Sequence, residues 1–597
     1  MKRYLATAWW LLAVQSGLLG AASGALLLLF SCLPAPELAA RIAACGPGES
    51  PALLTPARYL GLRLGLGAGL GLGLLGLTWA LGQRTRPRRP YSYSPARTRR
   101  PWWFGFMPGP ALTPAQGWLA GGLLGAVAGL HGWLAWYDPL SFDEAVSYDW
   151  FMHAGPAVAA SYYPFPNNHV LLSVLGAGLH QLVPAAGPLL VLRLLPTLVG
   201  LVALLASYQV LLAGLRFGPA TLAWLLINVA PPVLTAAVAG RGYGVAFAAL
   251  LGGVLASLVL LRPQGAGRAA RRGAWVVFGV SGVLGLYAVP THLYGLLGLL
   301  GSLLVGFGQF GGRRFRRHLL HLAVVSVGMA LVVATLYGPV IAVTSWGALA
   351  HNAYVQPLPW PALWRQLTGG YFPGVAGVLL GWPRATGSLF GLVALVSPLM
   401  LGWGRLPALS RRLGWLAYVQ LVAWLGFMQA QRVLPPARTL LAVPFFLVLL
   451  GFMGGQWAVA RWLWPGPRRA ARWVLVAGLG LVSGVGSYRV GHYWVATATP
   501  RRRSLASFER TYAWLRRRHP RVVWVPSQPL AVYLRHEALR RHQPPLPLVA
   551  ARPPGAVPRP GEYQVMLQLS ADQPAVYRDG QVAIVGAGEQ PAVSPVR

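Results

Sequence analysis

The stretch Asp138-Pro-Leu-Ser-Phe-Asp-Glu-Ala-Val-Ser-Tyr-Asp149 contains four of the twelve acidic residues in the chain. Residues 50–508 contain no other carboxylate, and long apolar runs lie on both sides of this stretch. Of the 597 residues, 55% are hydrophobic and 10% are charged, whereas a water-soluble protein of this length has about a quarter charged residues. Lipid must therefore solvate most of the chain, and we predict an α-helical polytopic membrane protein.

Apolar runs long enough to cross a bilayer recur along the whole sequence. A spanning helix needs about 20 largely apolar residues, and this criterion predicts about 13 spans. They are residues 8–31, 59–82, 117–137, 186–212, 217–239, 241–262, 273–290, 291–309, 319–345, 386–403, 413–430, 436–456 and 473–492. Two nearly continuous runs are divided at Gly240-Arg241-Gly242 and at Pro290-Thr291-His292, where a helix is expected to break.

The net charge of +38 comes almost wholly from arginine, since Lys2 is the only lysine. The arginines gather between the predicted spans, which is the pattern that sets membrane topology and not that of a nucleic-acid-binding surface. With the N-terminus inside, these arginines fall on cytoplasmic connections, at 84–100, 216, 262–272, 313–317, 405–412 and 461–472. The connections 138–185 and 346–385, and the residues from about 497 onward, then lie outside.

Asp143 and Glu144 are the candidate reacting groups, because ionisable groups near membrane depth are costly and are usually retained for function. A structural alternative stays open, since Ser141-x-x-Glu144 matches a capping box in which Glu144 only stabilises the start of a helix. This alternative explains Asp143 less well, because helix capping does not require two adjacent acids.

Other polar side chains fall at the same predicted level of the membrane. They lie at the outer ends of spans or in the acidic loop, and they are Arg193, Arg241, Tyr243, His292, Arg438, Tyr148, Asn168 and His169. Guanidinium groups bind phosphate bidentately and stay charged, so the arginines are candidates for holding a phosphate. The alternatives are that the arginines extend to lipid headgroups and that the asparagine caps a proline-rich turn.

Four short elements, in this order along the chain, resemble those of the GT-C membrane glycosyltransferases. They are Asp143-Glu144 in the first large outside loop, Arg193-Leu-Leu-Pro196 opening a span, Ala239-Gly-Arg-Gly-Tyr243 with one inserted glycine, and Pro436-Ala-Arg438 before a late span. The sequence looks most like glycosyltransferase family 39 and its bacterial relatives, which include protein O-mannosyltransferases and the lipid A aminoarabinose transferase. The resemblance covers about residues 115–490.

The resemblance implies a GT-C-like bundle, to which the apolar runs give about 13 transmembrane helices. The tail from about residue 498 has a different composition: residues 504–518 are expected to form a basic helix, and residues 521–525, 563–567 and 581–585 short strands, so we predict a small C-terminal extracytoplasmic α/β domain. Residues 1–105 then hold two additional N-terminal helices and a basic cytoplasmic loop, residues 106–495 form the catalytic transmembrane domain, and residues 496–597 form the α/β domain. In the first outside loop, Cys32 and Cys45 either form a disulfide or stay free.

The resulting hypothesis is an inverting glycosyltransferase of the cell (inner) membrane that moves a sugar from a polyprenyl-phosphate donor to an acceptor hydroxyl, at a site facing the periplasm or exterior. Asp143 would be the general base, and Glu144 would orient the acceptor or support Asp143. The groups expected to stabilise the leaving phosphate are Arg193, Arg241, Arg438 and His292. Those expected at the acceptor or in the loop are Tyr148, Asn168, His169 and Tyr243.

The expected partners are the lipid-linked donor, an acceptor glycan, lipid or protein, and membrane lipid, without nucleic acid. No cofactor or metal is expected, because the sequence has no phosphate-binding loop and no His/Cys cluster. Two rival classes stay open: a transporter or flippase, and a polysaccharide ligase or polymerase with the same kind of donor. Transporter sites usually lie near the bilayer midplane at broken helices, and Pro231-Pro232 interrupts one span, but the sequence has no internal repeat.

Overall fold

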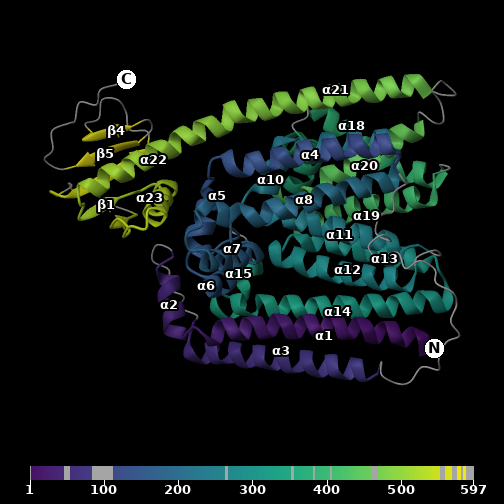
Figure 1. The fold of residues 1–597 in the computed structure, drawn as a ribbon, viewed down its shortest axis with the longest axis horizontal. Coiled ribbons are helices and arrows are strands. Elements are labelled where there is room, and N and C mark those ends of the chain that lie inside the picture. The colour runs from purple at the N-terminus through teal and green to yellow at the C-terminus, as the bar shows by residue number, and fades with distance from the viewer. Residues whose placement is uncertain are drawn as a thin grey trace.

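The structure is a computed structural model of the chain. It describes residues 2–45, 54–83, 112–262, 267–350, 355–380, 384–403, 406–458, 468–550, 559–567, 575–579 and 582–586. Long helices run side by side along the longest axis of the molecule, and a small sheet lies at one end (Figure 1). The predicted basic loop around residues 84–100 lies outside the described residues.

Each predicted span corresponds to a helix or a helix pair. These elements are α1 (Lys2–Ser31), α3 (Pro56–Gly82), α4 (Pro114–Tyr137), α8 (Pro188–Gly214), α9 (Phe217–Asn228), α10 (Pro231–Val238), α11 (Tyr243–Leu260), α12 (Arg268–Ala288), α13 (His292–Gly308), α14 (Gly312–Val343), α18 (Arg384–Trp403), α19 (Ala408–Gln431), α20 (Ala442–Ala458) and α21 (Arg468–Tyr493). Within the described residues, seven helices are long and apolar enough to cross a membrane, or up to eight if a bent pair counts as one. A helical polytopic membrane protein is therefore confirmed, and the larger number of spans stays a prediction.

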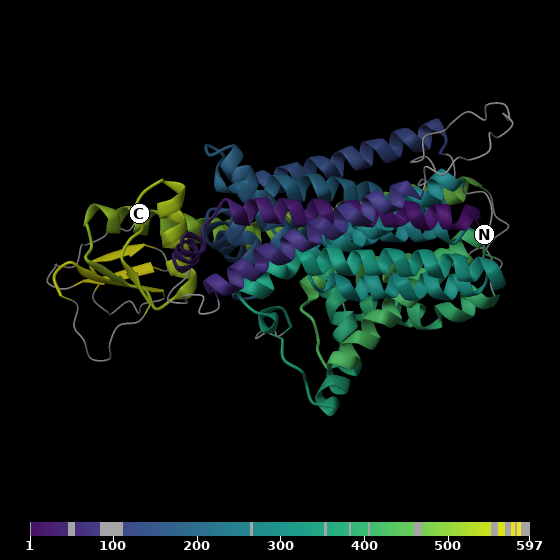
Figure 2. The ribbon, with the colours of Figure 1, turned by 90° about the horizontal axis from the view of Figure 1, so that it is seen from below.

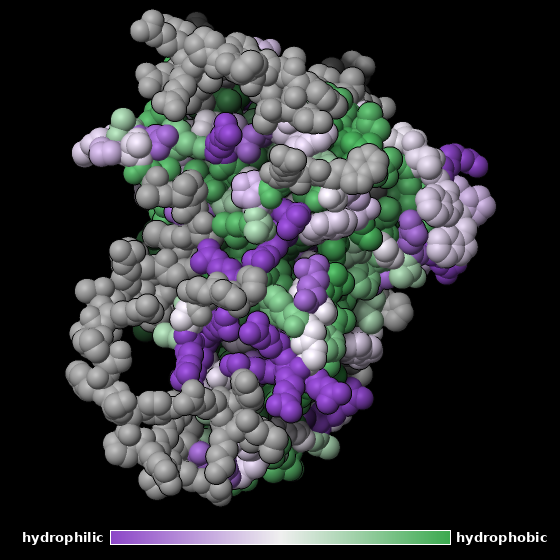
Figure 3. Space-filling view, turned by 90° about the vertical axis from the view of Figure 1, so that its right-hand side faces the viewer, coloured by the Kyte–Doolittle hydropathy of each residue, from purple (hydrophilic) through white to green (hydrophobic). Residues whose placement is uncertain are grey.

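The outward faces of these helices are apolar, as lipid contact requires. Leu64 and Leu75 of α3, Val202 of α8 and Leu395 of α18 are each more than half exposed, with exposed fractions of 65%, 68%, 59% and 70%. A water-soluble protein rarely exposes so many large apolar side chains together. At the end of the bundle where the N-terminus lies, hydrophilic side chains gather on the surface instead (Figure 3).

The N-terminal helices α1 and α3 pack closely through small residues. A Cβ atom on Gly73 of α3 would lie 2.5 Å from the backbone nitrogen of Gly20 in α1, and one on Gly69 would lie equally close to the Ser23 hydroxyl. Small residues let membrane helices approach in this way. The pair also packs against α14 and α12, so the two additional helices are part of the bundle.

The predicted span 217–239 is broken into α9 and α10, which meet at an angle of 70°. Pro231 and Pro232 open α10, and proline cannot continue the hydrogen-bond ladder of a preceding helix. The break directs the end of α10, and the turn Gly240-Arg241-Gly242 after it, toward the acidic stretch, where the Gly240 N–H donates to Glu144.

Short helices form the two long connections at the end that holds the acidic stretch. The first connection contains α5 (Phe142–Val146), the π-helix η2 (Ser147–Met152), α6 (Pro156–Ser161) and α7 (Val170–Leu182), and the second contains α15 (Trp346–Ala350), α16 (Trp360–Gln366), η3 (Leu367–Tyr371) and α17 (Phe372–Leu380). The predicted loop 346–385 is thus largely helical. Part of it projects sideways from the bundle (Figure 2), whereas the apolar α17 packs against α18 and α10.

The C-terminal domain contains one sheet and two helices. Its elements are η6 (Trp494–Ala498), α22 (Thr499–Arg517), β1 (Val522–Trp524), α23 (Gln528–Arg540), β2 (Leu548–Val549), β3 (Glu562–Leu567), β4 (Tyr577–Asp579) and β5 (Val582–Gly586). The strand order is β2-β1-β3-β5-β4, with β1 parallel to β2 and β3, and β5 antiparallel to β3 and β4. Helix α21 continues through η6 into α22, so one long helix leads from the bundle to this domain (Figure 1).

The α/β composition of this domain agrees with the sequence prediction, although α23, β2 and β4 were not foreseen. Both cysteines are free: Cys32 is exposed, and Cys45 is buried at the end of α2 (Ala35–Ala43). Burial raises the pKa of the Cys45 thiol to about 11. The disulfide alternative is therefore wrong for this structure.

Candidate active site

The acidic stretch enters α5 through a capping box. The Ser141 hydroxyl accepts the backbone N–H of Glu144 at 3.3 Å, and the Glu144 carboxylate accepts the backbone N–H of Ser141 at 3.0 Å. This reciprocal pair is the structural alternative considered for Glu144, and it fixes the first turn of α5. Asp143 lies in the same turn, but its side chain is 34% exposed whereas that of Glu144 is 2% exposed.

Arg193 of α8 is a buried structural residue that binds Glu144. Its Nε and Nη2 atoms donate to the two carboxylate oxygens of Glu144, each at 2.8 Å. Its remaining N–H groups go to the carbonyls of Ala135, Asp138 and Pro139. An arginine side chain has five N–H donors, and these contacts occupy all of them. The predicted phosphate contact of Arg193 is therefore not supported, because the side chain is enclosed and fully hydrogen-bonded.

Glu144 joins three parts of the chain. Besides Arg193 and Ser141, its carboxylate accepts the Gly240 N–H at 3.0 Å, which fastens the turn after α10 to α5. Burial alone would raise the pKa of Glu144, but Arg193 and the N–H groups of Gly240 and Ser141 lower it to about 2. This carboxylate stays charged at neutral pH and has no free face for an acceptor, so the predicted acceptor-orienting role is not supported.

Asp143 faces two guanidinium groups that come from distant segments. Its Oδ2 atom contacts Nη1 of Arg241 and lies 3.9 Å from Nη1 of Arg438. Arg438 lies in the 3-10 turn η4 (Ala437–Thr439), where its side chain is 58% exposed, while that of Arg241 is 9% exposed. Asn167 donates from Nδ2 to the Asp143 carbonyl at 3.0 Å and holds the backbone in place. The structure thus brings together Asp143, Arg241 and Arg438 at the surface of the bundle.

Arg241 is held in position by an aromatic and an imidazole side chain. Its Nε donates to Nε2 of His169 at 3.2 Å, and its guanidinium lies 5.2 Å from the ring centre of Tyr243. Burial lowers the pKa of His169 to about 4, so the imidazole is neutral and can accept this hydrogen bond. A Cβ atom on Gly242 would lie 2.6 Å from the carbonyl oxygen of Ala288, so the turn that carries Arg241 requires glycine there.

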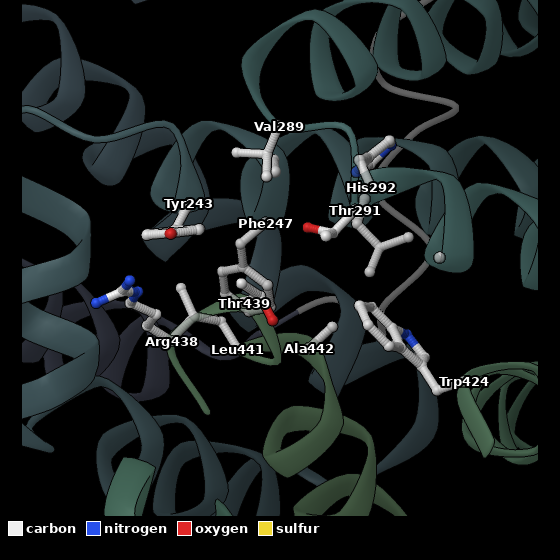
Figure 4. A pocket seen from close by; sticks show the side chains of 13 residues that line it. Tyr243, Phe247, Val289, Thr291, His292, Trp424, Arg438, Thr439, Leu441 and Ala442 are labelled. Atoms are coloured by element: carbon white, nitrogen blue, oxygen red, sulfur yellow. The ribbon is translucent and has the colours of Figure 1, made fainter. Parts of the chain in front are cut away.

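A small cavity of about 30 Å³ lies beside Arg438. Tyr243 and Arg438 lie at one side of it, and Trp424 and His292 lie at the other (Figure 4). Its remaining wall is mainly apolar, formed by the side chains Phe247, Leu250, Val289, Leu441 and Ala442. Within the described residues, no group of three or more His, Cys, Asp or Glu side chains is placed to hold a metal ion. The cavity presents an apolar wall next to the Arg438 guanidinium, and its volume corresponds to about one or two water molecules and not to a whole lipid chain.

Three other predicted site residues lie away from the Asp143 carboxylate. The ring of His292 packs over Gly285 on the far side of the cavity, so it is not brought together with the two arginines. Asn168 donates to the carbonyls of Ala159 and Tyr162, and it is its neighbour Asn167 that supports Asp143. Tyr148 lies elsewhere, among the rings of three histidines.

The two outer acids of the stretch are bound by residues from the C-terminal part of the chain. Tyr493 donates to Asp138 at 3.0 Å, and His536 pairs with Asp149 at 2.9 Å. No sequence signal near the acidic stretch could reveal these contacts, because the partners are 355 and 387 residues away. Of the four carboxylates, Asp143 alone faces the two arginines, and the other three hold the segment in place.

No protein-family model matches the chain, and no curated protein matches it in sequence. Several solved structures are similar to it. The crystal structure of ArnT from Cupriavidus metallidurans in the apo state has 18% sequence identity and a TM-score of 0.48, with 79% of this chain and 98% of that chain covered. The same protein bound to undecaprenyl phosphate has 17% identity and a TM-score of 0.44, with 81% and 95% covered.

A third is the cryo-EM structure of the arabinosyltransferase EmbB from Mycobacterium smegmatis, with 15% identity and a TM-score of 0.37. The match covers 67% of this chain and 34% of that chain, so this chain spans about a third of EmbB. All three TM-scores lie below 0.5, so the resemblance to GT-C membrane glycosyltransferases, and the narrower one to family 39, still rest on the sequence elements. At identities and scores this low, the likeness does not identify the chemistry of this chain, which has to be argued from its own site.

Proposed function

We propose that this chain is a membrane glycosyltransferase that moves a sugar from a polyprenyl phosphate to an acceptor hydroxyl at the outer face of the cytoplasmic membrane. The observation that carries the proposal is the placement of Asp143. Its carboxylate is 34% exposed and lies against Arg241 and Arg438, and Arg438 also lines a small, mainly apolar cavity. A lipid-linked sugar phosphate has complementary chemistry, because its chain is apolar and its head is anionic.

The two arginines have different tasks in this proposal. Arg241 is buried and held by His169 and Tyr243, so it gives a fixed cationic wall. Arg438 is exposed and lies only within 3.9 Å of Asp143, so an incoming phosphate can draw it away at little cost. A phosphate bound by both guanidiniums would leave the Asp143 carboxylate free beside it.

The reaction then needs one proton transfer and one displacement. The acceptor hydroxyl attacks the anomeric carbon on the face opposite the phosphate while Asp143 takes the hydroxyl proton. The bond between the anomeric carbon and the phosphate oxygen breaks, and its electron pair stays on the phosphate, where Arg241 and Arg438 stabilise the charge. A single displacement of this kind inverts the anomeric centre, and the proton leaves Asp143 for water.

A transporter is the alternative from a different class. Transporter sites usually lie near the bilayer midplane, whereas Asp143, Arg241 and Arg438 lie at the end of the bundle next to the C-terminal domain. A polysaccharide ligase or polymerase would use the same donor chemistry and differ only in the acceptor.

The test uses the purified full-length chain in proteoliposomes, with lipid-linked sugars extracted from the producing cells. The proposal predicts that polyprenyl phosphate accumulates together with a glycosylated acceptor. It also predicts that Arg241→Ala and Arg438→Ala reduce this accumulation, whereas Arg365→Ala, an exposed arginine of α16, leaves it unchanged. Movement of the intact lipid-linked sugar between leaflets, without release of polyprenyl phosphate, would instead identify a transporter.

A further inference from the structure

The contact between the C-terminal domain and the acidic segment contains a buried hydrogen-bonded pair of a histidine and a carboxylate. Nδ1 of His536 in α23 lies 2.9 Å from Oδ1 of Asp149 in η2. The side chains are 6% and 0% exposed, although the two residues are 387 positions apart. Such an enclosed carboxylate is retained only with a partner, because an unpaired buried charge is strongly destabilising.

Among the described residues, His536 is the hydrogen-bonding partner of the Asp149 side chain. The second oxygen of Asp149 is buried and accepts no hydrogen bond from the described residues. The ring of Tyr148 lies 5.8 Å from that of His536, and Tyr148 in turn contacts the rings of His153 and His180. The position of Asp149 therefore depends on where α23 places His536.

Two more contacts fasten the same segment to the C-terminal part of the chain. The ring of Phe142, directly before Asp143, lies 6.4 Å from that of Tyr533 on α23, which in turn stacks on Phe508 of α22 at 5.0 Å. Asp138 accepts a hydrogen bond from Tyr493 at the end of α21. The C-terminal part thus touches the segment before Asp143, beside it and after it.

We infer that the C-terminal domain positions the proposed base, and that His536 is the positioning residue through which it does so. This inference rests on the proposed function of Asp143. Asp149 lies in η2, which continues directly from α5, so a displacement of Asp149 is passed along a short stiff segment to Asp143. Arg241 and Arg438, the proposed phosphate-binding residues, belong to other segments outside this contact, so we expect them to keep their places when it is lost.

The test compares two replacements of His536 in the full-length chain. His536→Asn keeps an N–H donor at nearly the same distance from the backbone as Nδ1, whereas His536→Leu removes it. We expect His536→Leu to lower kcat about ten- to hundred-fold, since small misplacements of a reacting group cost that much. The KM for the lipid-linked donor and the binding of undecaprenyl phosphate should stay within about twofold of wild type, and His536→Asn should restore most of kcat.

A second variant covers the case in which His536→Leu does not fold. Tyr493→Phe removes only the hydroxyl that donates to Asp138, and we expect it to lower kcat by a smaller factor in the same direction. Arg510→Ala is the matched control, because it breaks the exposed pair of Arg510 with Asp579 within the C-terminal domain and should leave kcat unchanged.

The inference is overturned if a folded His536→Leu keeps wild-type kcat or acts only by raising the donor KM. If His536→Leu does not fold, a wild-type kcat in Tyr493→Phe overturns it. Asp143→Asn, measured in the same assay, separates this failure from that of the proposed function. An inactive Asp143→Asn beside a fully active His536→Leu refutes the positioning role alone. A fully active Asp143→Asn refutes the base itself.

Discussion

Replacing Arg193 by alanine should destabilise the folded chain and leave no specific defect in phosphate binding. In the folded chain Arg193 makes two charge-assisted hydrogen bonds to Glu144 and three contacts to backbone carbonyls. Hydrogen bonds to charged groups contribute about 1.5–3 kcal/mol each, and removing one partner of a buried ion pair costs about 3–5 kcal/mol. The two hydrogen bonds to Glu144 thus correspond to about 3–6 kcal/mol and the broken ion pair to about 3–5 kcal/mol, so we expect a loss of at least about 3 kcal/mol in the free energy of unfolding.

The assay is unfolding of the purified protein in detergent, followed by tryptophan fluorescence, beside equilibrium binding of undecaprenyl phosphate. Arg193→Ala should unfold at a clearly lower denaturant concentration than wild type, and Glu144→Gln should behave similarly because it leaves Arg193 buried without its counter-charge. The double variant Arg193→Met with Glu144→Gln should lose less stability than the two single changes added together. A folded Arg193→Ala with wild-type unfolding and no binding of undecaprenyl phosphate would refute the structural role and restore the phosphate contact predicted from the sequence.

Three further outcomes follow from the same geometry. Arg438→Ala should weaken the binding of undecaprenyl phosphate by about tenfold, with a larger effect at low salt than at high salt, whereas Arg365→Ala should leave it unchanged. Because the pKa of Glu144 is lowered from 4.5 to about 2 in the folded chain, its contribution to stability is complete above about pH 5 and is lost as the pH falls toward 2, which acid unfolding of wild type and Glu144→Gln can measure. Gly242→Ala should lower donor turnover and the unfolding midpoint together, since its Cβ atom would press on the Ala288 carbonyl and displace the turn that carries Arg241; a fully active and stable variant would show that this close approach is dispensable.

The helices of the bundle could be predicted from the sequence because membrane spanning depends on local properties. An apolar run of about 20 residues satisfies the requirement for a spanning helix wherever it occurs, so the predicted spans and observed helices agree closely, as for residues 59–82 and α3 (Pro56–Gly82). The same criterion did not reveal α17 (Phe372–Leu380), which lies within the predicted outside connection 346–385. At nine residues it is too short for that criterion, and only its packing against α18 and α10 reveals its place.

The candidate site could be predicted only in part. The scarcity of carboxylates directed attention to the stretch 138–149, and the arginines Arg241 and Arg438 do lie beside Asp143. The direction in which each side chain points could not be read from the sequence. Arg193 and Glu144 form a buried ion pair with one another, and Glu144 also completes the capping box of α5.

The contacts of the outer acids were out of reach for a different reason. Asp138 and Asp149 meet Tyr493 and His536 across more than half of the chain length. Pairings of that kind are fixed by the tertiary fold and leave no local pattern in a single sequence. These contacts explain why four acids occur in one stretch although Asp143 alone among them faces Arg241 and Arg438.

The most direct test of the account is the rate at which a single turnover releases polyprenyl phosphate from the lipid-linked donor in the presence of acceptor. Asp143→Asn should lower this rate by at least about a hundredfold, which is the lower range for loss of a general base. The affinity for undecaprenyl phosphate should stay close to that of wild type, because Arg241 and Arg438 remain. A rate for Asp143→Asn within a few-fold of wild type would contradict the assignment of Asp143 as the base.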